Sequence, residues 1–224
     1  MQIVILAAGE GIRLRPLTEN TPKPMLKIAG KPILEHNLLQ LPEEVDEIIL
    51  VVKYLKDQIE NYFGNEFQGK KIAYVEQEEN LGTAHALRVC KDFLKDGKFI
   101  SMMGDDLYSK KDISECIKHD LCVLAKETDG PKRFGVIEIK ENGFLKDIAD
   151  DFSGLESNFV NTGLFVLDKR FFDYEMVRVS SGEFGLPQTV SKMAKDYPIK
   201  VVKADFWFPI SNLEDLKKAE ELFS

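Results

Sequence analysis

The chain has 224 residues, 44% hydrophobic and 30% charged, which is the composition of a globular protein with enough apolar residues for one large domain or two small ones. Its formal net charge of −8 at pH 7 argues against non-specific nucleic-acid binding, which needs a basic surface. The apolar run at residues 3–8 is too short to span a membrane, and it lacks the preceding basic residues of a secretory signal.

The first half of the chain alternates between strand and helix patterns. Strands are predicted at residues 2–6, 47–52, 71–75 and 99–103, and helices at residues 31–41, 55–63 and 82–94. This order predicts an α/β fold, in which a parallel sheet has helices on both faces. Such sheets bind ligands at the carboxyl ends of their strands, so we expect the loops after residues 6 and 103 to share one site.

The pattern becomes less regular beyond residue 120. Strands are predicted at residues 121–125, 134–139 and 159–167, and helices at residues 186–195 and 213–223. We find no internal repeat, low-complexity tract or clear linker, and we therefore interpret residues 1–224 as one domain. The three cysteines, Cys90, Cys116 and Cys122, have no metal-ligand spacing. We expect them to be buried, reduced thiols of a cytoplasmic protein.

The loop after the first strand combines glycines with positive charge. Gly9 and Gly11 follow the strand, and the basic residues of positions 1–31 outnumber Glu10 and Glu19; they are Arg13, Arg15, Lys23, Lys27 and Lys31. A basic patch on an acidic protein predicts a small, highly charged anion as the ligand. Glycines allow backbone N–H groups to approach phosphate oxygens closely, while arginine can add a bidentate contact and lysine a mobile charge.

Two well-known phosphate-binding patterns are excluded. The dinucleotide fingerprint fails because Leu14 occupies the place of its third glycine, and no Gly-Lys-Ser/Thr follows to make a P-loop. A tight surface turn with solvated basic residues remains the alternative interpretation of the short Gly-x-Gly by itself.

The longer pattern around this loop resembles the sugar-phosphate nucleotidyltransferases. Its first part reads LAAGEGIRLRPLTENTPKPML at residues 6–26, followed by IAGKPILEH at residues 28–36. The resemblance continues with EQEENLGTAHAL at residues 76–87, MGDDLY at residues 103–108, NTGLFVLD at residues 161–168 and WFPISNLEDLKKAEELF at residues 207–223. It therefore covers nearly the whole chain.

The resemblance implies a Rossmann-like, three-layer α/β/α fold with a mostly parallel sheet. It also implies a reaction in which a sugar 1-phosphate attacks the α-phosphorus of a nucleoside triphosphate. Residues of about 1–110 would then bind the nucleotide, and residues of about 111–224 the sugar phosphate. We expect no nucleic-acid or membrane partner, and association between copies of the chain stays open.

The resemblance also implies the roles of individual residues. Arg13 would contact the leaving phosphates, Lys23 would bridge the α-phosphate and the sugar phosphate, and Asp105 would bind Mg²⁺. The nucleotide would be lined by Leu6, Ala8, Gly9, Gly11, Gln77, Gly82 and Thr83. Since Gln77 and Gly82 would read a pyrimidine edge, dTTP or UTP is favoured, without a choice between them. Gly135, Asp150, Asn161 and Thr162 would contact the sugar phosphate.

Two positions depart from the family pattern. Asp151 stands where a lysine usually meets the sugar phosphate, and Pro209 stands where an aspartate usually supplies a second metal ligand. The sequence around Ser211 and Asn212 predicts a capping box for the last helix. We also expect no C-terminal domain of the kind that many relatives carry. Two alternatives therefore stay open: a cytidylyl- or uridylyltransferase for another phosphorylated small molecule, and a weakly active or inactive paralogue that senses nucleotide or nucleotide sugar.

Overall fold

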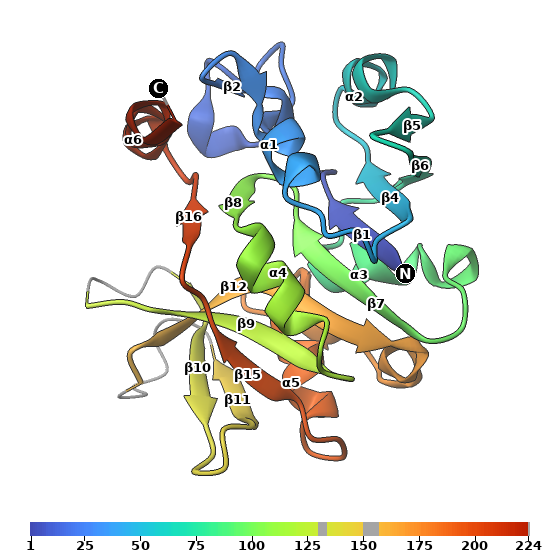
Figure 1. The fold of residues 1–224 in the computed structure, drawn as a ribbon, viewed down its shortest axis with the longest axis vertical. Coiled ribbons are helices and arrows are strands. Elements are labelled where there is room, and N and C mark those ends of the chain that lie inside the picture. The colour runs from blue at the N-terminus through green and yellow to red at the C-terminus, as the bar shows by residue number, and fades with distance from the viewer. Residues whose placement is uncertain (130–133, 150–156, 224) are drawn as a thin grey trace.

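The computed structural model describes residues 1–129, 134–149 and 157–223 (Figure 1). Its main sheet has the strand order β11-β10-β12-β7-β1-β4-β6-β5, with β9 and β15 joined to it through β12. The parallel part consists of β1 (Gln2–Leu6), β4 (Glu47–Val52), β6 (Lys70–Glu76) and β7 (Lys98–Met103). β1 pairs in parallel with both β4 and β7, and β4 with β6. The four strands predicted for the first half are confirmed.

The rest of the sheet is built around β12 (Phe159–Asp168), which runs antiparallel to β7 and to β9 (Cys122–Glu127). A hairpin of β10 (Val136–Ile139) and β11 (Leu145–Ala149) also joins β12, while β15 (Lys200–Lys203) lies parallel to β9. The strands predicted at residues 121–125, 134–139 and 159–167 are confirmed with shifted ends. The sequence patterns did not predict β11 or β15.

The remaining strands are short, and most of them form separate two-stranded pairs. They are β2 (Lys27–Ile28), β3 (Lys31–Pro32), β5 (Glu66–Phe67), β8 (Asp106–Tyr108), β13 (Val177–Arg178), β14 (Phe184–Gly185) and β16 (Trp207–Pro209). Among them, the antiparallel pair of β8 and β16 matters most for the site, because it brings the chain near residue 106 beside the chain near residue 209.

The predicted helices are α1 (Ile33–Leu39), α2 (Lys56–Phe63), α3 (Thr83–Arg88), α5 (Leu186–Met193) and α6 (Leu213–Phe223), to which the structure adds α4 (Lys110–Cys116). Single 3-10 turns occur at η1 (Ile12–Leu14), η2 (Lys23–Met25), η3 (Lys91–Phe93) and η4 (Lys169–Asp173). The prediction of one helix over residues 82–94 is wrong beyond Arg88, because the chain tightens into η3 and then extends at Leu94 to return to the sheet. No helix in the described ranges has both the length and the apolar composition needed to cross a bilayer.

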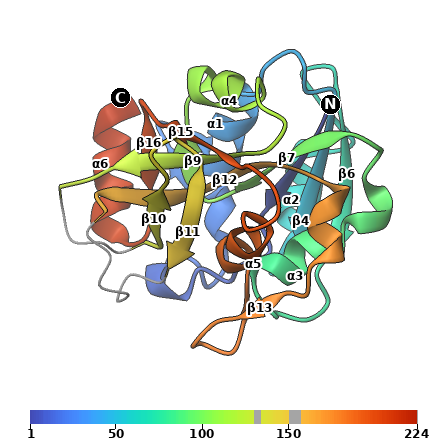
Figure 2. The ribbon, with the colours of Figure 1, turned by 90° about the horizontal axis from the view of Figure 1, so that it is seen from below.

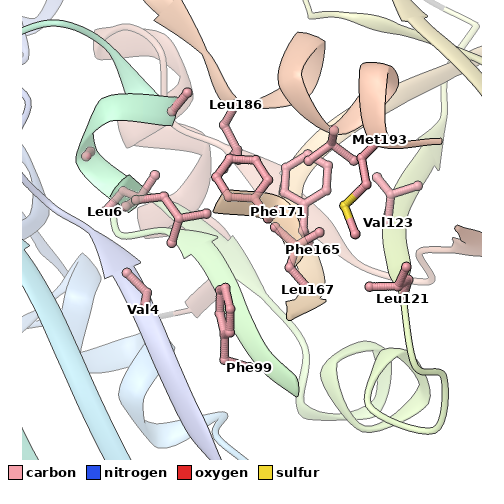
Figure 3. Close-up of a cluster of buried hydrophobic side chains, with 14 of the residues drawn as sticks. Val4, Leu6, Phe99, Leu121, Val123, Phe165, Leu167, Phe171, Leu186 and Met193 are labelled. Atoms are coloured by element: carbon pink, nitrogen blue, oxygen red, sulfur yellow. The ribbon is translucent and has the colours of Figure 1, made fainter. Parts of the chain in front are cut away.

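The core lies on both faces of the sheet. In β1, Val4 and Leu6 face one apolar cluster, shown in Figure 3, while Ile3 and Ile5 face the other. α3 and α5 contribute to the first cluster, and α1, α2 and α4 to the second. Figure 2 shows α1 and α4 on the opposite side of the sheet from α3 and α5. The predicted three-layer arrangement is therefore confirmed. The three cysteines are free and buried, and burial raises the pKa of Cys90 to about 12.

A third, smaller cluster lies beyond these layers. It contains Leu14, Leu26, Ile28, Ile33, Leu107, Ile210 and Ala219. These residues come from the glycine-rich loop, the β2–β3 region, the start of α1, β8, the chain after β16, and α6. We call this set the outer cluster. It joins the segments that carry the candidate site.

Candidate active site at the carboxyl ends of the parallel strands

Two cavities lie side by side where β1 and β7 end. The larger, of about 400 Å³, is lined by the glycine-rich loop, by the end of β6 and by the start of α3. The smaller, of about 240 Å³, is lined mainly by β12 and by the region of β8 and β16. Both cavities are lined by Arg13, Lys23, Thr83, Met103, Asp105 and Ser211. These six residues form the common wall of the two cavities.

The site lies where the strand order reverses direction. The chain continues from β1 to β4 and β6 on one side, and then places β7 on the other side of β1. Gly104 donates its N–H to the carbonyl of Leu6 at 2.9 Å, and a Cβ at Gly104 would lie 3.1 Å from that same oxygen. This close approach holds the two strand ends together at the crevice where open α/β sheets bind their ligands.

The glycine-rich loop presents unpaired backbone N–H groups to the larger cavity. Across residues 8–13, no backbone N–H donates a hydrogen bond to the part of the chain that the structure describes. Gly11 has φ +64°, and a Cβ there would lie 2.9 Å from Cβ of Lys23. The buried Thr18 fixes the loop from behind by donating to the Gly11 carbonyl at 2.8 Å. Successive free N–H groups in a fixed loop form an anion-binding nest.

The two basic residues of the common wall differ in their surroundings. Lys23 donates from Nζ to Oδ2 of Asp105 at 2.5 Å, in a pair whose side chains are 13% and 25% exposed. Lys23 begins η2 between Pro22 and Pro24, whose fixed φ angles stiffen the turn. Arg13 is exposed and forms no hydrogen bond or ion pair with the described residues. It is therefore available for an anionic ligand.

Gln77 is nearly buried and lines the larger cavity. Its Nε2 donates to the Gly82 carbonyl at 3.0 Å and lies 3.2 Å from Nδ1 of His85. Because the Gly82 carbonyl can only accept, the amide nitrogen must face it, and both N–H groups are then used. The amide oxygen is left as the acceptor for a ligand.

The segment that contains β14 packs against the chain around Gly82. A Cβ at Gly82, where φ is +98°, would lie 2.6 Å from the Phe184 carbonyl oxygen. Phe184 donates to the Leu81 carbonyl at 2.7 Å, and Leu186 donates to Oγ1 of Thr83 at 3.0 Å. These contacts place Glu183 in the wall of the larger cavity. The sequence patterns did not point to Glu183, because its position depends on the packing of β14.

The smaller cavity is shaped by a bulge in β12. Asn161 pairs with Ala125 and Phe165 with Val123, so the chain between Asn161 and Phe165 takes extra residues relative to β9. Gly163, with φ +81°, permits this, and a Cβ there would lie 2.5 Å from Cγ of Met103. The hydroxyl of Thr162 is committed, because it donates to the Leu124 carbonyl at 2.8 Å.

Asn161 keeps donors available in the smaller cavity. Its Oδ1 accepts from the Gly163 N–H at 3.1 Å, which orients the amide, while its Nδ2 has no hydrogen bond to the described residues. Gly135 accepts from the Asn161 N–H at 2.8 Å and so fixes its backbone. Phe134 and Trp207, with ring centroids 4.8 Å apart, add an aromatic wall.

Two carboxylates, Asp105 and Asp106, face the smaller cavity. Burial and the neighbouring Asp105 raise the pKa of Asp106 to about 7, although Lys23 opposes this shift. The described residues contain no group of three or more His, Cys, Asp or Glu side chains that could hold a metal ion. Mg²⁺ nevertheless suits this donor set, because it takes one or two carboxylates and fills its other positions with water and phosphate oxygens. The ammonium of Lys23 already shows that Asp105 accommodates a cation.

The structure brings together nearly all residues that the sequence predicted. The larger cavity is lined by Leu6, Ala8, Gly9, Gly11, Arg13, Lys23, Gln77, Gly82, Thr83 and Asp105. The smaller is lined by Gly135, Asn161 and Thr162 together with part of the common wall. Asp150 and Asp151 lie outside the described residues. The residues that sequence reasoning missed are Asn80, Met103, Asp106, Phe134, Gly163, Glu183, Trp207 and Ser211.

The end of the chain follows the predicted capping pattern. Oδ1 of Asn212 accepts from the N–H groups of Glu214 and Asp215, and Asp215 reaches back to the Ser211 N–H at 2.9 Å. The predicted N-cap is confirmed at Asn212, but the side chain that reaches back belongs to Asp215 and not to Glu214, and it accepts from Ser211 just before the cap. Ser211 still lines both cavities, so capping does not remove it from the site. Pro209 lies opposite Asp106 in the β8–β16 pair.

The sequence was compared with family models and with known proteins. A model described as nucleotidyl transferase matches residues 2–223. The chain belongs to the nucleotidyl transferase family. It is 36% identical to the bifunctional protein GlmU of Methanocaldococcus jannaschii over 99% of the chain and 54% of that protein. It is 32% identical to the UTP–glucose-1-phosphate uridylyltransferase AglF of Haloferax volcanii, over 99% of the chain and 96% of that protein.

The fold gives the same family relationship. A crystal structure described as a putative glucose-1-phosphate thymidylyltransferase from Bacillus anthracis, in complex with a sucrose, superposes with a TM-score of 0.88 at 25% identity. The match covers all of this chain and 95% of that one. The predicted family resemblance and the predicted Rossmann-like fold are confirmed. The chain spans about half the length of the GlmU proteins that it matches.

Proposed function

We propose that this chain transfers a nucleotidyl group from a nucleoside triphosphate to a sugar 1-phosphate, which yields a nucleotide sugar and pyrophosphate. The observation that carries this proposal is the pair of adjoining cavities whose common wall holds Arg13, Lys23 and Asp105. Two polyanionic substrates placed in these cavities would meet at that wall. The name of AglF, whose length the chain nearly covers, supports the same reaction.

The reaction asks mainly for alignment and for charge neutralisation. An oxygen of the sugar phosphate attacks the α-phosphorus, the bond from that phosphorus to the bridging oxygen breaks, and pyrophosphate leaves with the electron pair. The free N–H groups of residues 8–13 would hold the outer phosphates. Arg13 would neutralise the charge that develops on the departing pyrophosphate.

Lys23 would act between the two substrates, because it borders both cavities. Its ammonium is held by Asp105 in the substrate-free chain and would turn toward the α-phosphate and the sugar phosphate when these bring their larger negative charge. We propose Mg²⁺ as the metal and Asp105 as its ligand; when bound, it would neutralise triphosphate charge and make the α-phosphorus more electrophilic.

The base end of the larger cavity favours uracil or thymine. With both N–H groups of Gln77 committed, its amide oxygen can accept from the N3–H that these two bases carry. Cytosine has an acceptor at N3, so this nitrogen and the amide oxygen of Gln77 would face each other as two acceptors with no hydrogen between them. We therefore propose UTP or dTTP as the substrate, and the contact with Gln77 does not distinguish between the two.

The smaller cavity supplies donors for a sugar. The free Nδ2 of Asn161 would bind a sugar oxygen, and the rings of Phe134 and Trp207 would pack against the apolar face of the hexose. The committed hydroxyl of Thr162 would serve mainly to hold the bulge. The contribution of Asp150 stays a prediction from the sequence.

Pyrophosphate release in the presence of Mg²⁺ tests the function. The assay would combine UTP, dTTP, CTP, GTP and ATP with glucose, N-acetylglucosamine, galactose and mannose 1-phosphates and with phosphocholine. We expect release with UTP or dTTP and with at least one of the sugar 1-phosphates. Folded protein that releases no pyrophosphate with any pair would contradict the proposal and favour a sensor of nucleotides, whereas release with phosphocholine alone would indicate a different acceptor class.

A further inference from the structure

The mechanism above uses Asp105 and leaves its neighbour Asp106 without a role. Asp106 begins β8 and lies directly opposite Pro209 of β16. Asp105 and Asp106 are the two acidic residues that line the smaller cavity within the described chain. Because Pro209 brings no charge, Asp106 is the second carboxylate at this wall among the described residues.

The contacts of Asp106 leave part of its carboxylate free. Oδ2 accepts from Nε1 of Trp207 at 3.2 Å, and Oδ1 accepts from the Ile210 N–H at 3.3 Å. Both distances lie at or beyond the long end of the usual range, so the bonds are weak. A carboxylate offers about four lone-pair positions, and two weak bonds occupy only half of them. Each oxygen therefore keeps a position for another partner.

The carboxylates at this wall have few ion-pair partners. Lys23 contacts Asp105, whereas Arg13, which lines the same cavity, forms no ion pair with either carboxylate in the described chain. When Lys23 and Arg13 turn to the substrate phosphates, both carboxylates would remain without an ion-pair partner. Two carboxylates with free lone pairs beside a site for a triphosphate offer the oxygen donors that a hard divalent cation prefers.

We infer that Asp106 is the second protein carboxylate for the divalent metal, which Asp105 and Asp106 hold together with phosphate oxygens. This inference rests on the proposed function. Asp106 lines the smaller cavity, and the bonds from Trp207 and Ile210 fix the orientation of its carboxylate. Asp106 is thus both a metal ligand and an anchor of β16.

The experiment must separate these two tasks, and the chain offers a matched control. Asp112 of α4 accepts from the N–H groups of Asp205 and Phe206 at 3.0 and 2.9 Å. It therefore anchors the segment just before β16 with the same kind of bond, and it lines neither cavity. Asp112→Asn weakens the anchoring and leaves the carboxylates of the site unchanged.

A double variant tests the position of the charge. Residues directly opposite in an antiparallel pair have Cβ atoms about 4.5–5.5 Å apart and project from the same face. Asp106→Asn combined with Pro209→Asp would therefore move the carboxylate across the ladder while it keeps the number of charges. If Asp106 binds the metal, this double variant should recover metal binding that Asp106→Asn loses.

Binding of Mn²⁺ would be followed by electron paramagnetic resonance, with a UTP analogue whose α,β-bridging oxygen is replaced by methylene, so that no turnover occurs. Circular dichroism and melting temperature would show that each variant folds. We expect Asp106→Asn to weaken Mn²⁺ binding at least tenfold, Asp112→Asn to change it less than threefold, and the double variant to recover most of the loss.

Two results would overturn the role of Asp106. One is unchanged Mn²⁺ affinity in Asp106→Asn, and the other is an equal loss in Asp112→Asn, which would assign the effect to anchoring of β16. If the wild-type protein binds the analogue but binds no Mn²⁺, the proposed metal site is overturned and nucleotide binding still stands. A wild-type protein that binds neither would contradict the proposed function itself, so the failures are distinguishable.

Discussion

Replacement of Lys23 by methionine tests the common wall most directly. Methionine keeps an apolar stem of similar length beside Gly11 and removes only the ammonium. Because Lys23 borders both cavities, its charge would act most strongly when the two phosphates approach one another. Loss of one such preorganised group costs about 2.7–4 kcal/mol in the transition state, or roughly 10²–10³ in kcat.

The assay is pyrophosphate release at saturating substrate concentrations, and KM is measured for both substrates. We expect kcat to fall by roughly 10²–10³ while KM changes less, because the charge contributes mainly to the transition state. Loss of the part-buried Lys23–Asp105 pair should also lower stability by roughly 1–3 kcal/mol, between the values for exposed and buried pairs.

The control is Lys27→Met, because Lys27 is an exposed lysine on β2 that lines neither cavity. It should leave kcat unchanged. If Lys23→Met retained kcat within threefold of the wild type, Lys23 would not contact the transferring phosphoryl group and the assignment of the common wall would be refuted.

Three further predictions concern the base, the loop and the carboxylates. Gln77→Leu should reduce kcat/KM for UTP by roughly 10–100-fold, since the acceptor for N3–H is lost, and an unchanged preference for UTP over CTP would exclude Gln77 from base recognition. Gly11→Ala should lower the melting temperature, because a left-handed non-glycine residue costs roughly 1–2 kcal/mol before its contact with Lys23 is counted. Gly9→Ala, whose Cβ meets nothing within 4 Å, should keep the stability and weaken nucleotide binding. Equal melting temperatures for the two variants would contradict this account of the loop. Burial and Asp105 raise the pKa of Asp106 to about 7, so the native state binds more protons than the unfolded chain between roughly pH 4, near the ordinary aspartate pKa, and pH 7. The stability of the metal-free protein should therefore fall as the pH rises through this window. Urea titrations at several pH values would measure this fall, and Asp106→Asn should flatten it.

The nucleotide side of the site was predictable because its residues lie in two motifs, at residues 6–26 and 76–87, that resemble the family pattern. The glycines, Arg13 and Lys23 all lie in the segment between β1 and β2, and Gln77 and Gly82 flank the turn from β6 to α3. Buried parallel strands have clear apolar runs, so the positions of their carboxyl ends could also be read from the sequence. Strand order predicted that the loops after residues 6 and 103 share a site, and the family resemblance assigned Gln77 and Gly82 to the nucleotide.

The missed residues depend on contacts between distant segments. Glu183 reaches the larger cavity because β14 packs on Gly82, and Trp207 reaches the smaller one because β16 pairs with β8. Both strands have only two or three residues, which is too short for a periodic pattern. Asp106 gave an ambiguous signal, since a carboxylate after a strand also fits an ordinary turn.

α4 shows a signal that was present and not used. Ser109 accepts at its side chain from the Asp112 N–H, and Ser-x-x-Asp is a recognisable start of a helix. The helix that follows has seven residues and few apolar positions, so its periodicity was weak. By contrast, the predicted helix over residues 82–94 had suitable apolar spacing, but the return of the chain to β7 ended it at Arg88.

The outer cluster gives the site a dependence on residues that touch no substrate. Leu14 of the glycine-rich loop, Leu107 beside Asp106, and Ala219 of α6 share this small core, and α6 also accepts the Ala29 N–H through Glu220 at 2.8 Å. Elements that share a small core tend to open together as one cooperative unit. Amide hydrogen exchange in α6 and in the loop should therefore be correlated, and substitutions at Ala219 should change the local stability of the site without changing any residue that lines the two cavities.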